Sequence, residues 1–350
     1  MANGTKGRVL VGMSGGVDSS AAAVLLRQDG YEVGGATFRL WPENGTGDID
    51  DARAVCEALG IPHYILDFQQ LFREKVVDAF AAAYYRAQTP NPCIYCNRYL
   101  KFPAFWEEAR RLGYDCISTG HYSIVEYDAA RQLHRLKKGV SEKKDQSYVL
   151  YSLTQELLAH IRMPLGPYTK EEVREIVRQA GLPVFNRPDS QDICFVPDGD
   201  YPAFIENYTG KPFPGGEFVD AAGMPLAPHK GIGRYTIGQR KGLGISLGKP
   251  AFVTAIDAAT GAVTLDDNAA LWTDTLTADT VNWLEPVDVS VPLRVHAKIR
   301  YAHKAAPATV TLLEPDVVQV RFDEPVRAIT PGQSVAFYDG EYLLGGGSIR

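Results

Sequence analysis

Two cysteines, Cys93 and Cys96, lie three positions apart in the stretch TPNPCIYCN, between Thr89 and Asn97. Two thiols at this spacing can form part of a metal site, a redox pair, or a nucleophile with an unrelated neighbour. Structural zinc would need further cysteines or histidines at ligand spacing, and none lies nearby. The prolines predict a loop rather than the helix start of a thioredoxin-like pair. The remaining chemistry is sulfur handling, through a persulfide or an iron–sulfur cluster.

The other three cysteines differ in their surroundings. Cys56 lies beside the apolar stripe of an expected helix and Cys116 in an expected strand, so both are interpreted as buried small hydrophobic side chains. Cys194 lies in the polar stretch PDSQDICFVPDGD, where we expect another loop. Because loops carry function more often than packing, Cys194 joins Cys93 and Cys96 as a candidate catalytic residue.

A second chemical motif, GMSGGVDSS, runs from Gly12 to Ser20 between an expected strand and an expected helix. Glycines there let backbone N–H groups turn toward one anion, and the start of the helix adds its dipole. The lysine of the G-x-x-x-x-G-K-[ST] phosphate loop is missing. The pattern S-G-G-x-D-S instead resembles the pyrophosphate-binding loop of enzymes that cleave ATP to AMP. The hydroxyls of Ser14 and Ser19 would donate to phosphate, and Asp18 would hold Mg²⁺.

The elements that position these motifs follow from the hydrophobic pattern. Strands are expected at 8–11, 32–38, 63–67 and 116–119, and helices at 19–28, 50–59, 72–85 and 101–112. Strands alternating with helices predict an α/β domain with a parallel sheet. Ligands bind such sheets at the carboxyl ends of the strands.

The pattern changes after about residue 197, where Pro and Gly become frequent and helical periodicity ends. Short Val/Thr/Leu alternations then predict a small antiparallel barrel. We therefore expect a nucleotide-binding and catalytic domain (1–200), a small mixed β domain (201–275) and a C-terminal β-barrel (276–350).

Composition restricts the function classes. A hydrophobic content of 45% and a charged content of 22% are ordinary for a globular protein. No apolar run predicts a membrane helix, no signal peptide is recognisable, and five cysteines do not suggest a disulfide scaffold, so a cytoplasmic protein is expected. The net charge of −6 argues against a general nucleic-acid coat but allows local basic patches. Two are candidates for tRNA phosphates: the run from Arg131 to Lys144, and the group Lys230, Arg234, Arg240 and Lys241.

The chain as a whole resembles the tRNA-specific 2-thiouridylases, the MnmA family. The resemblance rests on seven ordered blocks: GMSGGVDSS, TPNPCIYCN, STGHY, KDQSYVLY, DSQDICFV, YTIGQRKGLGI and DEPVRAITPGQSVAFY. It implies that ATP adenylates the 2-oxygen of the wobble uridine in the tRNA anticodon, and that sulfur then replaces this oxygen. It also implies a PP-loop ATPase fold, a sulfur donor (a cysteine desulfurase, a relay protein or inorganic sulfide) and tRNA rather than DNA as partner.

The resemblance assigns roles to residues of the matching blocks. Cys96 would be the nucleophile, and Cys194 would carry the incoming persulfide and end in a disulfide with Cys96. The ATP-binding residues would be Gly12, Met13, Ser14, Gly15, Gly16, Val17, Asp18, Ser19, Phe38 and Gly120. The tRNA-binding residues would be Asn91, Pro92, Cys93, His121, Lys144, Asp145, Gln146, Arg300, Tyr301 and Gln333, with 91–93 at the target base.

One position departs from the common family pattern, which has aspartate where this chain has Cys93. An aspartate there is a plausible general acid or base, a role that a thiol with its higher ordinary pKa does not inherit. The change gives three thiols, and related tRNA thiolation enzymes hold a [4Fe-4S] cluster on three cysteines. We hypothesise such a cluster on Cys93, Cys96 and Cys194, with persulfide transfer as the alternative. Two other functions remain open: an adenylating synthetase or amidotransferase, and an RNA-binding protein without catalysis.

Overall fold

A parallel five-stranded sheet forms the centre of the first domain in the computed structural model, which describes residues 5–42, 47–187 and 193–350. The strand order is β3-β2-β1-β4-β7, and every neighbouring pair is parallel. The bounds are β1 (Arg8–Gly12), β2 (Glu32–Arg39), β3 (His63–Asp67), β4 (Cys116–Ser118) and β7 (Ile161–Arg162). The α/β fold class is confirmed, and β1 ends where the glycine motif begins.

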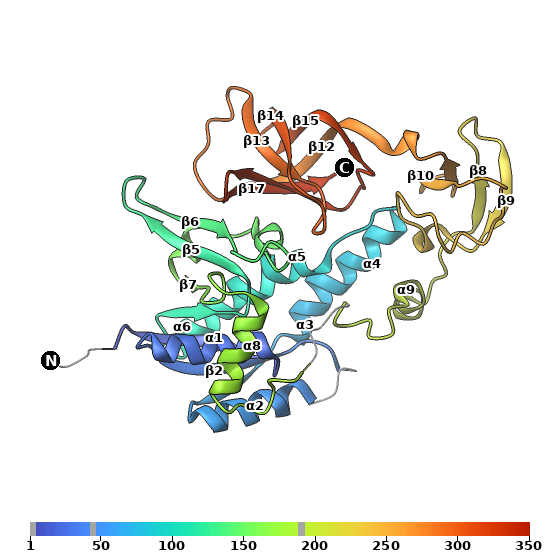
Figure 1. The fold of residues 1–350 in the computed structure, drawn as a ribbon. Coiled ribbons are helices and arrows are strands. Elements are labelled where there is room, and N and C mark those ends of the chain that lie inside the picture. Colours follow the sequence, from blue (N-terminus) through green and yellow to red (C-terminus); the bar gives the residue numbers. More distant parts are fainter. Residues whose placement is uncertain (1–4, 43–46, 188–192) are drawn as a thin grey trace.

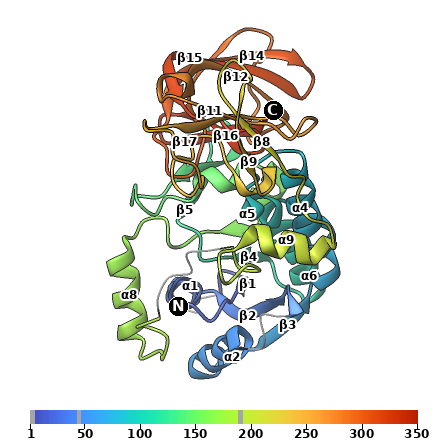
Figure 2. The same cartoon turned by 90° about the vertical axis from the view of Figure 1, so that its right-hand side faces the viewer.

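Helices cover both faces of this sheet, because the apolar residues of β1 alternate between them. Val9 and Val11 pack in one hydrophobic cluster with α1 (Val17–Gln28) and α2 (Gly47–Leu59). Leu10 packs in another cluster with Phe105 of α6 (Phe105–Arg111). Cys56 and Cys116 are buried in the first cluster, which confirms their interpretation as packing residues. Two views show the layers (Figures 1 and 2).

The segment between β3 and β4 differs from the expectation. It contains α3 (Gln69–Phe72), a π-helical segment η2 (Arg73–Val77), α4 (Asp78–Tyr85), α5 (Pro92–Cys96), a second π-helical segment η3 (Asn97–Ala104) and then α6. The prediction of a loop at Cys93 and Cys96 was wrong, because both cysteines belong to α5. Asn91 caps that helix and Pro92 opens it, and a proline with its fixed φ is favourable at this position.

The middle part of the chain begins with a helix that the sequence reading missed, α9 (Tyr201–Thr209). Asp200 caps its start and Gly210 ends it in the left-handed conformation (φ 66°). A four-stranded sheet follows in the order β10-β11-β8-β9. Its strands are β8 (Gly216–Val219), β9 (Pro225–His229), β10 (Phe252–Ile256) and β11 (Val263–Asp266).

The C-terminal part is the expected β-barrel. Six strands follow the order β12-β15-β14-β13-β16-β17, and β12 also pairs with β17 and closes the ring. The bounds are β12 (Trp272–Trp283), β13 (Leu293–Lys298), β14 (Ala306–Glu314), β15 (Val317–Arg327), β16 (Ser334–Asp339) and β17 (Tyr342–Ile349). Closure removes the free strand edges that an open antiparallel sheet would expose.

A hairpin from the first domain joins this barrel. It consists of β5 (Ser123–Asp128) and β6 (Leu133–Lys138), and β6 pairs with β17 at Leu136–Leu343 and Lys137–Tyr342. The order of the full sheet therefore ends β17-β6-β5. Two short helical elements, η4 (Ser147–Leu150) and α7 (Gln155–Ala159), contact β6, whereas α8 (Lys170–Gln179) packs against α1.

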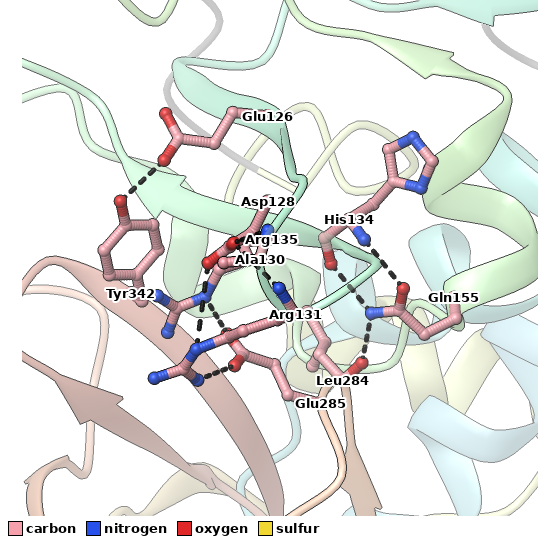
Figure 3. Close-up of polar contacts among 10 residues, drawn as sticks. All are labelled: Glu126, Asp128, Ala130, Arg131, His134, Arg135, Gln155, Leu284, Glu285 and Tyr342. Atoms are coloured by element: carbon pink, nitrogen blue, oxygen red, sulfur yellow. Dashed lines mark hydrogen bonds and ion pairs between the residues drawn. The ribbon is translucent and has the colours of Figure 1, made fainter.

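Two arginines expected to grip tRNA instead fasten the hairpin to the barrel (Figure 3). Arg135 donates to Glu285 at 2.7 Å with both side chains buried, and its guanidinium lies 3.6 Å from the ring centre of Tyr342. Arg131 donates to the other oxygen of Glu285 at 3.1 Å. Tyr342 donates in turn to Glu126 at 2.6 Å. The basic run is thus partly an interdomain contact.

Candidate active site

The glycine motif forms a tight loop between β1 and α1. Gly15 adopts φ 67°, and a Cβ there would lie 2.7 Å from Cβ of Asp51, so a side chain is excluded on both counts. The side chains of Ser14 and Ser19 lie 3.3 Å apart, and Ser19 accepts a hydrogen bond from the Ser14 backbone at 3.2 Å. Two hydroxyls and the first backbone N–H groups of a 12-residue helix therefore meet at one point, which suits a phosphate group.

Asp18 has partners that the sequence reading did not find. Its Oδ1 accepts from Lys170 Nζ at 2.7 Å and from the Tyr122 hydroxyl at 2.7 Å. Lys170 opens α8, more than 150 positions along the chain, and no local pattern marks it. Because an ammonium already neutralises this carboxylate, Asp18 does not fit as a dedicated magnesium site. Any Mg²⁺ here would be held mainly by the ATP phosphates.

Two other predicted ATP-binding residues lie against the loop. The Phe38 ring packs on Phe105 at 4.9 Å between ring centres, and it reaches within 3.5 Å of the position that a Cβ on Gly12 would take. A Cβ on Gly120 would lie 2.9 Å from Cβ of Asp18 and 3.0 Å from the Ser19 nitrogen. Only glycine therefore lets the end of β4 approach the start of α1. Phe38, Gly12 and Gly120 form one neighbourhood beside the phosphate loop, with Met13 and Val17 buried beneath it.

The three candidate cysteines lie near one another. Cys96 is buried at the end of α5, whereas Cys93 and Cys194 are exposed. Burial raises the pKa of the Cys96 thiol to about 12, while Lys101 acts to lower it, and Cys194 and Cys93 act to raise it. The side chains are thus close enough for the charge of one to act on the others. The 189–192 part of the DSQDICFV block lies outside the described residues.

Lys101 is the cation that serves all three thiols. It lies on the π-helical segment η3, five residues after Cys96, where a wider turn places such positions on one face. Burial alone would lower its pKa, but the thiols of Cys96, Cys93 and Cys194 raise it above the ordinary value. No role for this residue follows from the sequence alone. The sequence feature that could have marked Lys101 is its position shortly after the cysteine motif.

The hypothesis of a [4Fe-4S] cluster rests on these three cysteines. Among the residues that the structure describes, no group of three His, Cys, Asp or Glu side chains is placed to hold a metal ion. A [4Fe-4S] cluster binds each cysteine through a different iron, so its ligands need not surround one ion, and the cluster on Cys93, Cys96 and Cys194 stays a prediction. What the three thiols share is an electrostatic environment around Lys101.

The residues predicted to meet tRNA around β4 are largely buried. His121 is 7% exposed, shares a hydrogen bond with Thr119 at 2.7 Å through Nδ1 and packs on Phe102; burial, then Lys101, lowers its pKa to about 3. Asp145 is 6% exposed and accepts from Gly139 and Ser147. The Gln146 side chain accepts from the Tyr122 backbone. Lys144 is half-buried beside them. These contacts position the loop, and contact with tRNA stays a prediction.

The predicted residues of the barrel lie near the cysteine helix. Gln333 donates to the Thr89 carbonyl at 2.7 Å, and the Thr89 nitrogen donates to the Pro331 carbonyl at 2.8 Å. The loop before β16 thus clasps the chain two residues ahead of Asn91. Tyr301 is 40% exposed, and burial, then Asp145, then Cys93 raise its pKa, which places it near the exposed thiol.

The side chain of Arg300 donates hydrogen bonds to other parts of the protein. It donates to the carbonyls of Ile237 at 3.2 Å and Ala328 at 2.6 Å and to the Thr330 hydroxyl. It therefore joins the middle domain to the barrel, and burial lowers its pKa. Asn91 and Pro92 lie at the start of α5, where the Asn91 side chain accepts from the Cys93 nitrogen at 3.1 Å.

Comparison with known proteins decides the family. Three family models match successive parts of the chain: the tRNA methyl transferase HUP domain at 7–198, the tRNA methyl transferase PRC-barrel domain at 202–267, and the aminomethyltransferase beta-barrel domain at 273–349. The tRNA-specific 2-thiouridylase MnmA of Acetivibrio thermocellus is 48% identical, covering 99% of this chain and 100% of that protein. The chain belongs to the tRNA-specific 2-thiouridylase family. The MnmA protein of Clostridioides difficile is also 48% identical, covering 98% of each chain.

Solved structures similar to this thiouridylase-family chain are more distant. The U34-tRNA thiolase NcsA from Methanococcus maripaludis with its [4Fe-4S] cluster has a TM-score of 0.36 and 18% identity, covering 59% of this chain and 68% of that one. An NMN synthetase from Francisella tularensis has the same TM-score and 19% identity, covering 59% and 78%. Likeness at this level carries no argument about the site. No helix in the described part of the chain is both long and apolar enough to span a bilayer.

Proposed function

We propose that this protein is an ATP-dependent tRNA sulfurtransferase that replaces the 2-oxygen of the wobble uridine by sulfur. The observation that carries the proposal is the grouping of Cys93, Cys96 and Cys194 around Lys101, in a chain of this family that also carries the phosphate loop. An ATP-cleaving loop activates an oxygen as a leaving group, and thiols supply the replacing atom. An adenylating synthetase would need the loop but not three cysteines around one lysine.

In the first step, the loop from Gly12 to Ser19 holds the phosphates of ATP, with Phe38 and Gly120 beside the adenosine. The 2-oxygen of the uridine attacks the α-phosphorus, and pyrophosphate leaves into the donors of the loop. Ser14, Ser19 and the N-terminus of α1 offset the charge that develops on this leaving group. Mg²⁺ would supply further charge neutralisation on the phosphates.

In the second step, sulfur replaces AMP at C2. We propose that Cys194 carries a persulfide from the sulfur donor, and that its terminal sulfur attacks C2 while the C2–oxygen bond to AMP breaks. Cys96 then attacks the inner sulfur of Cys194, which releases the new thiocarbonyl and leaves a Cys96–Cys194 disulfide. An external thiol reductant must restore the two thiols. Lys101 is suited to stabilise the Cys96 thiolate, which burial otherwise disfavours.

A [4Fe-4S] cluster on Cys93, Cys96 and Cys194 would supply an alternative sulfur route. We favour the persulfide route because Lys101 is placed to stabilise the Cys96 thiolate that this route requires. Anaerobic purification followed by iron and sulfide analysis tests this choice. Iron-free protein that thiolates tRNA with a persulfide donor supports it. About four irons per chain, needed for activity, would overturn it.

The reaction class has its own test. Release of pyrophosphate from ATP should require unmodified tRNA, because the uridine oxygen is the group that attacks. Release without RNA would favour an adenylating synthetase or amidotransferase. No release under any condition would favour an RNA-binding protein without catalysis. We further propose that the anticodon arm of tRNA is the part recognised, that a separate protein or inorganic sulfide donates sulfur, and that the protein acts in the cytoplasm.

A further inference from the structure

A cavity of about 100 Å³ lies between α5 and the barrel, on a different face of α5 from the cysteines. Asn91, Ile94, Tyr95 and Arg98 line it, and their three- and four-residue spacing places them on one side of a helix. The barrel contributes Thr280, Gly332, Ser334 and Ser348, and the first domain adds Tyr151. The volume is several times the ~10–15 Å³ that one water needs, so the cavity admits a larger polar group.

Among the described residues that line the cavity, Arg98 is the only charged one. Its guanidinium lies 5.7 Å from the ring centre of Tyr151, and within the described residues it makes no ion pair or hydrogen bond. A half-buried guanidinium with its donors unused is costly unless a ligand or water satisfies it. The other polar groups facing the cavity are hydroxyls and an amide, and its described lining residues include no carboxylate. This chemistry favours an anion.

The barrel wall of the cavity carries backbone strain. Thr280 adopts φ 51°, which is rare for a β-branched residue. It lies where the pairing of β12 with β17 shifts register between Asp279 and Asn282. Bulges of this kind often re-aim a side chain beside a functional site. The strained backbone at Thr280 is thus an indication, independent of Arg98, that this wall of the cavity contacts a ligand.

The cavity also borders two predicted RNA contacts. Asn91 lies on its wall and caps the helix that carries Cys93, and Gln333 lies between the wall residues Gly332 and Ser334. The Tyr151 ring is only 2% exposed and its hydroxyl is bonded to Ser334 at 3.0 Å, so it offers no open face to a base. A phosphate next to the target uridine fits these features better than a base.

We propose that this cavity binds one backbone phosphate of the RNA adjacent to the target uridine, with Arg98 as the residue that recognises it. The inference rests on the proposed function, since it takes RNA as the ligand. It adds a site on the face of α5 opposite to the chemistry. A phosphate held there would fix the uridine relative to Cys93 and Cys96 without touching either thiol.

The test measures binding of an anticodon stem-loop RNA without ATP, so that its outcome does not depend on catalysis. Two further RNAs each carry one uncharged methylphosphonate, on the 5′ or the 3′ side of the target uridine. The proteins are wild type, Arg98→Gln, Arg98→Lys and a matched control, Arg178→Gln, which removes an exposed guanidinium paired with Glu175 on α8. Thermal unfolding checks that each variant is folded.

We expect wild type to lose about tenfold in affinity when one of the two phosphates is neutralised. Arg98→Gln should bind the unmodified RNA about tenfold more weakly and lose nothing further on that substituted RNA. Its salt slope should fall by about 0.7, the value of one single-strand phosphate, while Arg98→Lys keeps the slope and Arg178→Gln behaves as wild type.

Three results would overturn the proposal. The first is unchanged RNA affinity and salt slope in folded Arg98→Gln. The second is an additive loss, in which the variant and each neutralised phosphate weaken binding independently. The third combines two observations: millimolar inorganic phosphate competes with RNA for wild type, and the variants bind RNA with the same affinity as wild type. That result would make the cavity a site for free phosphate. If Arg98→Gln does not fold, a reduced salt slope in Arg98→Lys would overturn it as well. Failure of the proposed function would appear separately, as tRNA-independent pyrophosphate release.

Discussion

Replacing Glu285 by glutamine should strongly destabilise the contact between the first domain and the barrel. The substitution keeps the shape of the side chain and removes its charge. Arg135 is 6% exposed and then lies buried without a counter-charge, because its main partner is Glu285 at 2.7 Å. Glu285 is itself 3% exposed, and Arg131 at 3.1 Å is its second partner. Figure 3 shows Glu285 paired with the guanidinium of Arg135.

The expected loss is about 3–5 kcal/mol, the usual cost of removing one partner of a buried ion pair. At roughly 2 °C per kcal/mol for a chain of this size, the Tm falls by about 6–10 °C. The contact of Arg135 with Tyr342 does not compensate, since a cation–π pair contributes only about 1–2 kcal/mol and is present in both proteins. The double variant Glu285→Gln with Arg135→Met should be more stable than Glu285→Gln alone, because no buried charge remains unpaired.

Thermal and urea unfolding measure the effect, with hydrogen exchange at β6 and β17 as a local readout. The control is Asp323→Asn, which breaks an exposed ion pair with Arg294 on the barrel, and we expect no measurable change there. A loss below about 1 kcal/mol for Glu285→Gln would refute the reasoning. So would a double variant less stable than both single variants, because it would show that the pair itself stabilises the fold.

Three other predictions concern the site. In the free protein, the rate of Cys96 alkylation, followed by mass spectrometry, should be slow at pH 8 and should increase with pH, because burial raises the pKa of this thiol. Lys101→Met should slow the alkylation further, and faster alkylation of this variant would contradict the prediction. Gly120→Ala should raise the KM for ATP at least tenfold, because its Cβ would press on Asp18 at 2.9 Å; an unchanged KM would show that the loop yields easily. The pKa of His121 is lowered to about 3, so an unfolded chain binds a proton that the folded one does not between pH 6.5 and 3. The free energy of unfolding is therefore highest above pH 6.5 and decreases as the pH is lowered, by about 2 kcal/mol at pH 5. Urea unfolding of His121→Gln should not show this decrease.

The sequence was sufficient for the strands and helices around the phosphate loop, because hydrophobic periodicity and glycine placement are local signals. At α5 the same kind of local signal points two ways, because Asn91 and Pro92 are typical of a loop and also of a helix start, and here they begin a helix. The family resemblance named the cysteines. It did not reveal Lys101, whose effect depends on a π-helical turn.

Local sequence patterns do not predict contacts between distant parts of the chain. No pattern near Asp18 points to Lys170, and nothing near Arg135 points to Glu285, since each pair meets only after the domains pack. For that reason the sequence of the basic run predicts an RNA surface, although two of its arginines pair with a carboxylate of the barrel. Buried His121 and Asp145 show the same limit, because burial depends on what packs over a loop.

The pairing of β6 with β17 has a consequence for engineering and for evolution by domain exchange. A barrel taken from a relative would have to come with the 123–138 hairpin, although that hairpin lies more than 130 residues upstream of β12. A truncated enzyme that ends before the barrel would leave β6 as an open edge and Arg135 without its anion, and such an edge invites aggregation. The barrel and the 123–138 hairpin thus form one structural unit that is discontinuous in sequence. The boundaries of an exchanged segment should therefore be chosen from the strand pairing.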